Sequence, residues 1–153
     1  MDISKLKTID DIINYAADKE QEASDLYKDL ADRTTRTGVK EMFMDLSKQE
    51  AGHKVKVLSL KKGGLPMKPV AQVADLKISD YLTSETVGPK SSYQDILIFA
   101  MKREEASVGL YTALAGVATD GKAKGVLLAL ADEERKHKLR IETEYDENVL
   151  KEN

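Results

Sequence analysis

The chain of 153 residues has no cysteine, no tryptophan, two phenylalanines and three prolines. The lack of cysteine excludes disulfides, thiolate metal ligands, cysteine nucleophiles and cysteine-ligated iron–sulfur clusters. Any bound metal must therefore be held by oxygen and imidazole nitrogen. Because aromatic residues are sparse whereas alanine, leucine, lysine and glutamate are abundant, the composition favours helices over strands as the core-forming elements.

Two further absences limit the partners that we expect. No apolar run approaches the roughly 18 residues of a membrane-spanning helix, and the polar N-terminus does not resemble a signal peptide. Lysine and arginine total 24 against 27 acidic residues, with no basic run that could bind nucleic acid. We therefore expect a cytoplasmic protein that contacts neither membrane nor nucleic acid, with residues 1–153 forming a single domain.

Apolar residues recur at intervals of three and four, which predicts amphipathic helices over about 8–34, 38–62, 92–118 and 121–148. Thr8 is expected to cap the first helix, Ser91 or Ser92 the third, and Gly38 is expected in the first turn. All three prolines lie within 63–91. We interpret this segment as a long crossover that contains at most one short helix, in the stretch VADLKISDYL.

The sequence repeats itself at an offset of 84 residues without a gap. This repeat predicts two similar helical hairpins joined by the crossover, which is the organisation of an all-α, ferritin-like four-helix bundle. The identical pairs are Ala16/Ala100, Glu20/Glu104, Leu26/Leu110, Tyr27/Tyr111, Leu30/Leu114, Ala31/Ala115, Thr35/Thr119, Lys40/Lys124, Leu46/Leu130, Glu50/Glu134, His53/His137 and Lys54/Lys138.

Both histidines of the chain follow a glutamate by three positions, in the pairs Glu50–His53 and Glu134–His137. Glu50 lies 15 residues after the turn at Thr35, and Glu20 lies 15 residues before that turn. Glu134 and Glu104 lie at the same distances from the second turn, at Thr119. At a rise of 1.5 Å per residue, both positions are roughly 22 Å from the turn. Packing of the two apolar faces would bring four carboxylates and two imidazoles to one level, namely Glu20, Glu50, His53, Glu104, Glu134 and His137.

Four buried carboxylates require compensation, because desolvation and mutual repulsion both favour protonation. Two divalent cations would balance them, and this donor set is typical of di-iron and di-manganese carboxylate bundles. Zinc and calcium fit less well. A single Glu-x-x-His is more often a solvated pair on an exposed helix, but two copies at matching depth with Glu20 and Glu104 favour a dinuclear site.

Other polar residues nearby have simpler interpretations. Tyr27 and Tyr111 are either core rings whose hydroxyls bond a ligand carboxylate or redox participants near the metals. The remaining glutamates close to these positions are predicted to be solvated helix surface, namely Glu22, Glu41, Glu105, Glu133 and Glu142.

Four segments of the chain resemble the di-iron domain of the rubrerythrin family, within the ferritin-like superfamily: EQEASDLYKDLA, EEASVGLYTALA, LSKQEAGH and LADEERKH. The resemblance implies that the six residues named above bind two iron ions, with Glu50 and Glu134 as bridging carboxylates. It also implies an oxidoreductase that reduces hydrogen peroxide or dioxygen. Manganese is the alternative metal.

The chain departs from rubrerythrin at two points. Ser107 stands where rubrerythrin has a further glutamate, so the resemblance does not imply that the site is tuned for peroxidase activity as in rubrerythrin. The chain also has no cysteine-ligated rubredoxin domain. The second departure implies an external electron-donor protein such as a rubredoxin. The alternative functions are a ferroxidase, an iron-binding or storage protein, and a non-catalytic metal-binding or structural bundle. We expect a homodimer.

Overall fold

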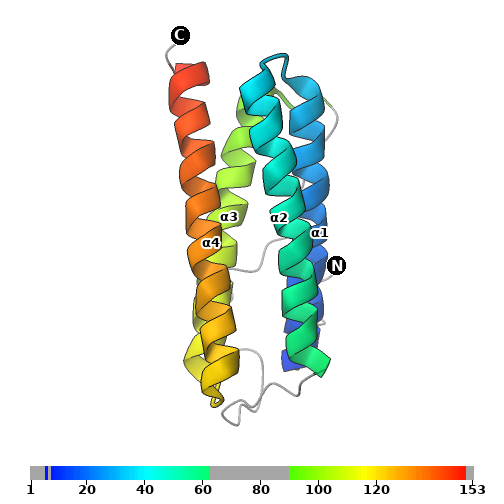
Figure 1. Ribbon diagram of the computed structural model, residues 1–153, viewed down its shortest axis with the longest axis vertical. Coiled ribbons are helices and arrows are strands. Elements are labelled where there is room, and N and C mark those ends of the chain that lie inside the picture. The colour runs from blue at the N-terminus through cyan, green and yellow to red at the C-terminus, as the bar shows by residue number, and fades with distance from the viewer. Residues whose placement is uncertain (1–5, 7, 63–89, 151–153) are drawn as a thin grey trace.

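The computed structural model describes residue 6, residues 8–62 and residues 90–150, and within these ranges it contains helices and no strand. The four long helices are α1 (Ile9–Arg33), α2 (Thr37–Lys62), α3 (Tyr93–Val117) and α4 (Gly121–Tyr145), and a short π-helix, η4 (Asp146–Leu150), follows α4 directly (Figure 1). The predicted all-α four-helix bundle is confirmed. The stretch VADLKISDYL lies outside the described residues.

Short polar side chains begin three of the helices. Thr8 accepts a hydrogen bond from the backbone N–H of Asp11 while the Asp11 carboxylate accepts one from Thr8, so both orphan donors at the start of α1 are satisfied. Ser92 caps α3 and Asp120 caps α4. The predicted capping by Thr8 is therefore confirmed, and Ser92 rather than Ser91 caps α3. Gly38 lies in the first turn of α2 and not in the preceding turn.

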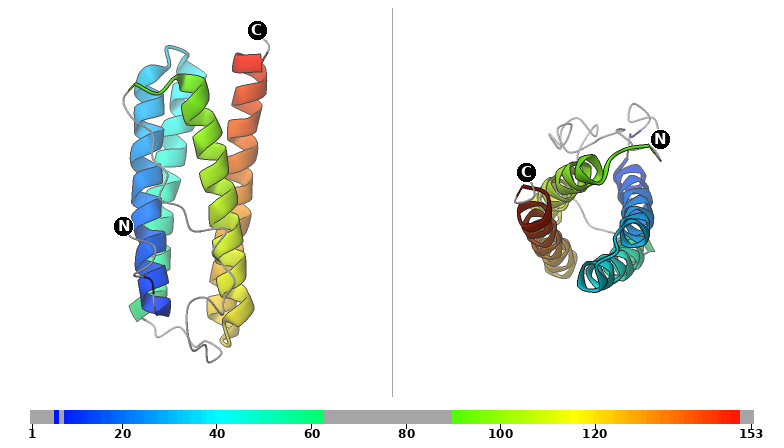
Figure 2. Two further views of the ribbon diagram at one scale, coloured as in Figure 1. Left: turned by 180° about the vertical axis from the view of Figure 1, so that it is seen from behind. Right: turned by 90° about the horizontal axis from the view of Figure 1, so that it is seen from above.

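The helices pack as two hairpins, α1 on α2 and α3 on α4, with only three residues between the helices of each pair. Viewed from above, the four helices surround a common axis (Figure 2). The end of α2 and the start of α3 lie at opposite ends of the bundle (Figure 1). Helices α2 and α3 therefore run in the same direction, which is the arrangement expected when two hairpins are joined by a crossover.

Two apolar clusters fill the bundle, one on each side of its middle. One contains residues such as Ile12, Val57 and Leu127, and the other contains residues such as Leu30, Phe43 and Ile141. On every helix the predicted metal ligands fall between the residues of these two clusters. The fold thus places a charged layer between two apolar clusters. None of the helices within the described ranges is long and apolar enough to cross a membrane.

Candidate metal centre

All six predicted ligand residues lie in the charged layer, and each is at most 2% exposed to solvent. Helices α1 and α3 contribute one glutamate each, whereas α2 and α4 each contribute a glutamate and a histidine one helical turn apart. Residues three apart on a helix share a face, so each Glu-x-x-His directs both side chains towards the bundle axis. The structure therefore brings together Glu20, Glu50, His53, Glu104, Glu134 and His137.

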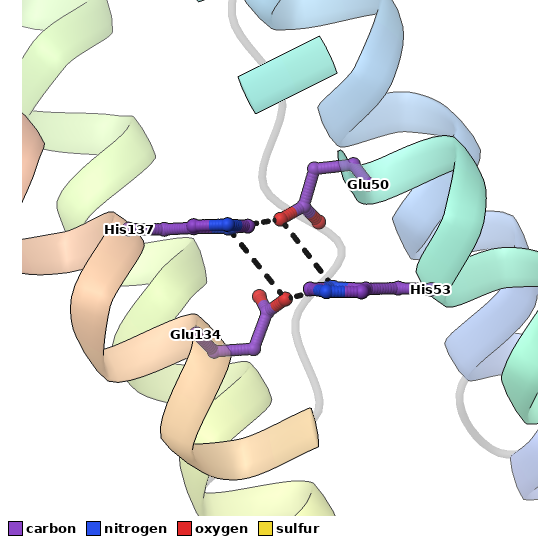
Figure 3. A group of neighbouring side chains, drawn as sticks. All are labelled: Glu50, His53, Glu134 and His137. Atoms are coloured by element: carbon purple, nitrogen blue, oxygen red, sulfur yellow. Dashed lines mark hydrogen bonds and ion pairs between the residues drawn. The ribbon is translucent and has the colours of Figure 1, made fainter. Parts of the chain in front are cut away.

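Two glutamates and two histidines form a compact group at the centre of this layer (Figure 3). Glu50 Oε1 lies 2.5 Å from His137 Nδ1 and 3.7 Å from His53 Nδ1, and Glu134 Oε1 lies 2.5 Å from His53 Nδ1 and 3.8 Å from His137 Nδ1. The imidazole rings stack with centroids 5.3 Å apart. One donor atom from each residue lies within 4.8 Å of all the others. Each of these two carboxylates therefore lies between both imidazoles.

The other two glutamates each approach one imidazole only. Glu20 Oε2 is 3.6 Å from His53 Nδ1, and Glu104 Oε1 is 3.8 Å from His137 Nδ1. The donors consequently divide into two sets, one around His53 with Glu20 and one around His137 with Glu104. Glu50 and Glu134 are common to both sets, which is the position that a bridging carboxylate requires.

The two buried tyrosines connect the hairpins. Tyr27 on α1 donates a hydrogen bond to Glu104 on α3, and Tyr111 on α3 donates one to Glu20 on α1 at 2.7 Å. Burial, together with the nearby carboxylates, raises the pKa of both phenols well above the usual value, so they remain protonated donors. Each tyrosine thus orients the outer glutamate of the opposite hairpin, which is the first of the two roles predicted for them.

Burial is the main influence on the carboxyl groups of this layer. It raises the pKa of Glu50 and Glu134 well above the usual range and that of Glu104 to about 7. The charges of neighbouring carboxylates add to the shift at Glu50 and Glu134, whereas hydrogen bonds with Glu134 and Tyr27 partly offset it at Glu104. Burial also acts on Glu20, but interactions with Glu50, His53 and Tyr111 outweigh it and lower the pKa of Glu20. Without a cation, Glu50, Glu104 and Glu134 therefore retain their protons to a higher pH than free carboxyl groups do.

The two imidazoles titrate in opposite directions. Burial would lower the pKa of His53, but Glu20 and Glu133 outweigh burial and raise it. Burial and the neighbouring His53 together lower the pKa of His137 to about 4. The imidazole of His53 therefore holds its second proton to a higher pH than that of His137, although the two occupy equivalent positions of the repeat.

Four buried atoms of the layer have no hydrogen-bond partner: Glu20 Oε2, His53 Nδ1, Glu104 Oε2 and Glu134 Oε1. Unpaired buried polar atoms are costly and rare, and a bound cation would satisfy them. His53 Nδ1 and Glu134 Oε1 lie 2.5 Å apart without hydrogen-bond geometry. The six residues offer oxygen and imidazole donors, with two carboxylates shared between two sets, and this donor chemistry fits two divalent ions.

Sequence reasoning missed the residues that contact the outer nitrogen of each imidazole. Glu133, predicted to be solvated surface, has a side chain only 39% exposed, and its Oε2 is 2.5 Å from His53 Nε2. Glu133 is therefore partly solvated, as predicted, but it also contacts His53, which the prediction did not include. Gln49 Oε1 is 2.7 Å from His137 Nε2. Both residues immediately precede the glutamate of a Glu-x-x-His, at equivalent positions of the repeat, and that shared position was the available signal.

Comparison with solved structures agrees with this architecture. A hypothetical protein from Pyrococcus furiosus matches with a TM-score of 0.68 and 25% identity over 88% of this chain and 86% of its own. The crystal structure of a proposed ferritin-like diiron-carboxylate protein from Thermotoga maritima matches with a TM-score of 0.70 and 16% identity, over 91% of this chain and 95% of its own. The fold is ferritin-like. No family model and no curated protein matches the sequence.

Proposed function

We propose that this ferritin-like protein is a di-iron carboxylate oxidoreductase, similar to rubrerythrin, that reduces hydrogen peroxide or dioxygen with electrons from an external donor. The observation that carries the proposal is the buried donor set, whose four unpaired atoms lie among shared carboxylates. The likeness to a proposed diiron-carboxylate protein supports iron over manganese. Glu20, Glu50, His53, Glu104, Glu134 and His137 would hold the two ions.

When bound, a pair of iron ions supplies one electron per ion and Lewis acidity towards an oxygen-containing substrate. Reduction of peroxide to two waters consumes two electrons and two protons, so an outside protein such as a rubredoxin must return the electrons. The residues of this chain hold the site in shape and exclude bulk water. The phenols of Tyr27 and Tyr111 keep the outer carboxylates oriented by donating a hydrogen bond to each of them.

In the metal-free protein the layer is connected to the surface through Glu133. Glu133, half-exposed, contacts the outer nitrogen of His53, while the inner nitrogen of the same ring faces Glu134. While no cation is bound to the inner nitrogen, this imidazole can accept a proton on one side and release it on the other, and a cation bound there closes the route. We include cytoplasmic location and a homodimer in the proposal.

Anaerobic loading with Fe(II), followed by metal analysis and then by addition of hydrogen peroxide and reduced rubredoxin, tests the proposal. We expect about two ions per chain and peroxide-dependent oxidation of the rubredoxin. His53→Ala and His137→Ala should each weaken loading, whereas Glu105→Ala, which alters an exposed carboxylate beside Glu104, should not. Loading below one ion per chain would refute the dinuclear site.

The same assay separates the alternative activities. Repeated oxidation of Fe(II) in large excess over the protein, without rubredoxin turnover, would identify a ferroxidase in which iron is the substrate. An iron store would in addition elute as a closed shell of many subunits on size-exclusion chromatography, not as a dimer. Two bound metals with no reactivity towards either oxidant would leave a metal-binding bundle and remove the proposed activity.

A further inference from the structure

The two imidazoles of the candidate metal centre differ in what their outer nitrogens contact. His53 Nε2 lies 2.5 Å from a carboxylate oxygen of Glu133, whereas His137 Nε2 lies 2.7 Å from the amide oxygen of Gln49. Positions 49 and 133 are equivalent in the 84-residue repeat, as are the two histidines. The centre is therefore symmetric in its inner donors and asymmetric immediately outside them.

The orientation of the Gln49 amide is fixed by its other contact. Gln49 Nε2 donates a hydrogen bond of 2.8 Å to Asp45, so its oxygen is the atom that faces His137. The Asp45 carboxylate in turn accepts a hydrogen bond from Arg140 at 3.0 Å. On this side of the centre, negative charge is thus separated from the imidazole by one neutral amide.

On the other side of the centre, around His53, the equivalent positions of the repeat carry different residues. Ala129 stands where the first hairpin has Asp45, and Lys56 stands where the second has Arg140. Lys56 Nζ is 3.9 Å from Glu133 Oε1, and both side chains are more than one-third exposed. A hollow of about 210 Å³, lined in part by Ala129 and Lys56, lies at this seam between α2 and α4. The carboxylate of Glu133 therefore contacts His53 without an intervening amide.

This difference changes what each imidazole offers to a cation. In both rings Nδ1 faces the carboxylates, so a cation bound there leaves Nε2 as an N–H donor. An N–H that donates to a carboxylate makes the imidazole a stronger ligand than one that donates to a neutral amide, and such outer partners typically change metal affinity by about 10- to 100-fold.

We propose that Glu133 is a positioning residue that makes the His53 half of the centre the tighter metal position, so that the two ions are bound in a fixed order. The ion held by His53 and Glu20 binds first, and the ion held by His137 and Glu104 binds second. Gln49 keeps the second position weaker. This inference rests on the proposed metal centre and adds an inequivalence that its inner ligands alone do not possess.

Titration of the metal-free protein with Co(II), followed by calorimetry and by visible absorption, tests the inference. We expect two binding steps whose dissociation constants differ by about 10- to 100-fold. Glu133→Gln should weaken the first step and bring the two constants together. The matched control is Glu105→Gln, which makes the same charge change directly beside the ligand Glu104, and it should leave both constants unchanged.

A second variant tests the inference by strengthening the weaker metal position. Gln49→Glu combined with Asp45→Ala gives the first hairpin the residues found at positions 133 and 129. We expect the second step to tighten until it approaches the first, which a merely structural role of Glu133 would not produce. Thermal unfolding of each metal-free variant should show that all of them fold.

The possible results separate this inference from the proposed function. Two steps of equal affinity that Glu133→Gln leaves equal would overturn the inference while the dinuclear centre stands. Equal weakening by Glu133→Gln and Glu105→Gln would also overturn it, because the effect would then be one of net charge. Failure of the unaltered protein to bind Co(II) or Fe(II) would refute the metal centre itself.

Discussion

The charged layer in the middle of the bundle and the apolar layers on either side are buried to the same extent, yet burial has opposite energetic consequences for them. Each fully buried Leu, Ile or Phe stabilises the fold by about 1.5–3 kcal/mol. Burying a carboxylate costs free energy unless a cation or hydrogen bonds compensate it. The apolar layers therefore stabilise the bundle, and the charged layer is retained at a cost that bound cations would offset.

The largest effect is expected from an apolar layer. Leu127 is fully buried in the cluster next to the start of α4, and Leu127→Ala should lower the free energy of unfolding by about 2–5 kcal/mol through lost transfer energy and a residual cavity. Urea unfolding measures the change. Leu128, its neighbour on the same helix, is 42% exposed, so Leu128→Ala is the matched control and should change stability by less than about 0.5 kcal/mol. Similar losses in both variants would contradict the assigned layers.

The pH dependence of the metal-free protein should reveal the cost of the charged layer. Because the pKa of Glu104 is about 7 in the folded state and near 4.5 when unfolded, the folded protein retains a proton that the unfolded chain loses as pH rises through this window. Stability is then lost as pH rises, by on the order of 3 kcal/mol for this group. Glu50, Glu134 and His53, whose pKa values are also raised, act in the same direction.

Two groups oppose this trend. The lowered pKa values of His137, about 4, and of Glu20 favour folding as pH rises, but the effect of His137 is complete by about pH 6.5. We therefore expect a net loss of stability that is steepest above pH 6.5. Urea unfolding with chelator present, from about pH 5 to pH 8, measures it, and loading with metal should flatten the profile because cations replace the protons. A metal-free protein that becomes more stable above pH 6.5 would contradict the assigned shifts.

The sequence was sufficient to predict the level of each ligand along the bundle but not the neighbours of those ligands. Helical rise and the 84-residue offset determine depth, so Glu20 and Glu104 could be placed beside their Glu-x-x-His pairs. Which hairpin a side chain contacts depends on the lateral packing of α1 on α3 and of α2 on α4, which local periodicity does not contain. For this reason the contact of Tyr27 with Glu104, and that of Glu133 with His53, appeared only in the structure.

A smaller effect is expected from the tyrosines that join the hairpins. Tyr27→Phe and Tyr111→Phe each remove a donor from a buried carboxylate, and leaving that oxygen unpaired should cost about 1–3 kcal/mol in the metal-free protein. Tyr145→Phe is the control, because the hydroxyl of Tyr145 bonds only the exposed Gln94 in the described part of the chain. We expect both buried variants to lose stability, and a variant as stable as the unaltered protein would contradict the contact assigned to that tyrosine.

The smallest effect is expected from a buried polar contact outside the charged layer. Ser24 and Ser47 join α1 to α2 by reciprocal hydrogen bonds of 2.9 and 2.8 Å to each other's carbonyl oxygens, whereas the second hairpin has Val108 and Ala131 at the equivalent positions. Ser47→Ala should cost about 1 kcal/mol, because it removes one of these bonds and leaves the Ser24 hydroxyl with fewer partners. Thermal unfolding measures the loss.

The double variant Ser24→Val, Ser47→Ala copies the second hairpin and should recover part of this loss, because an apolar side chain then replaces the remaining buried hydroxyl at position 24. Comparison of the double variant with Ser47→Ala and Ser24→Val alone gives the interaction energy between the two side chains. If the two losses simply add, the serines contribute stability that the apolar pair cannot supply, and the first hairpin depends on polar contacts beyond the charged layer. If they cancel, the two hairpins are energetically equivalent there, and the pair of Ser24 and Ser47 contributes nothing that the apolar pair of the second hairpin cannot supply.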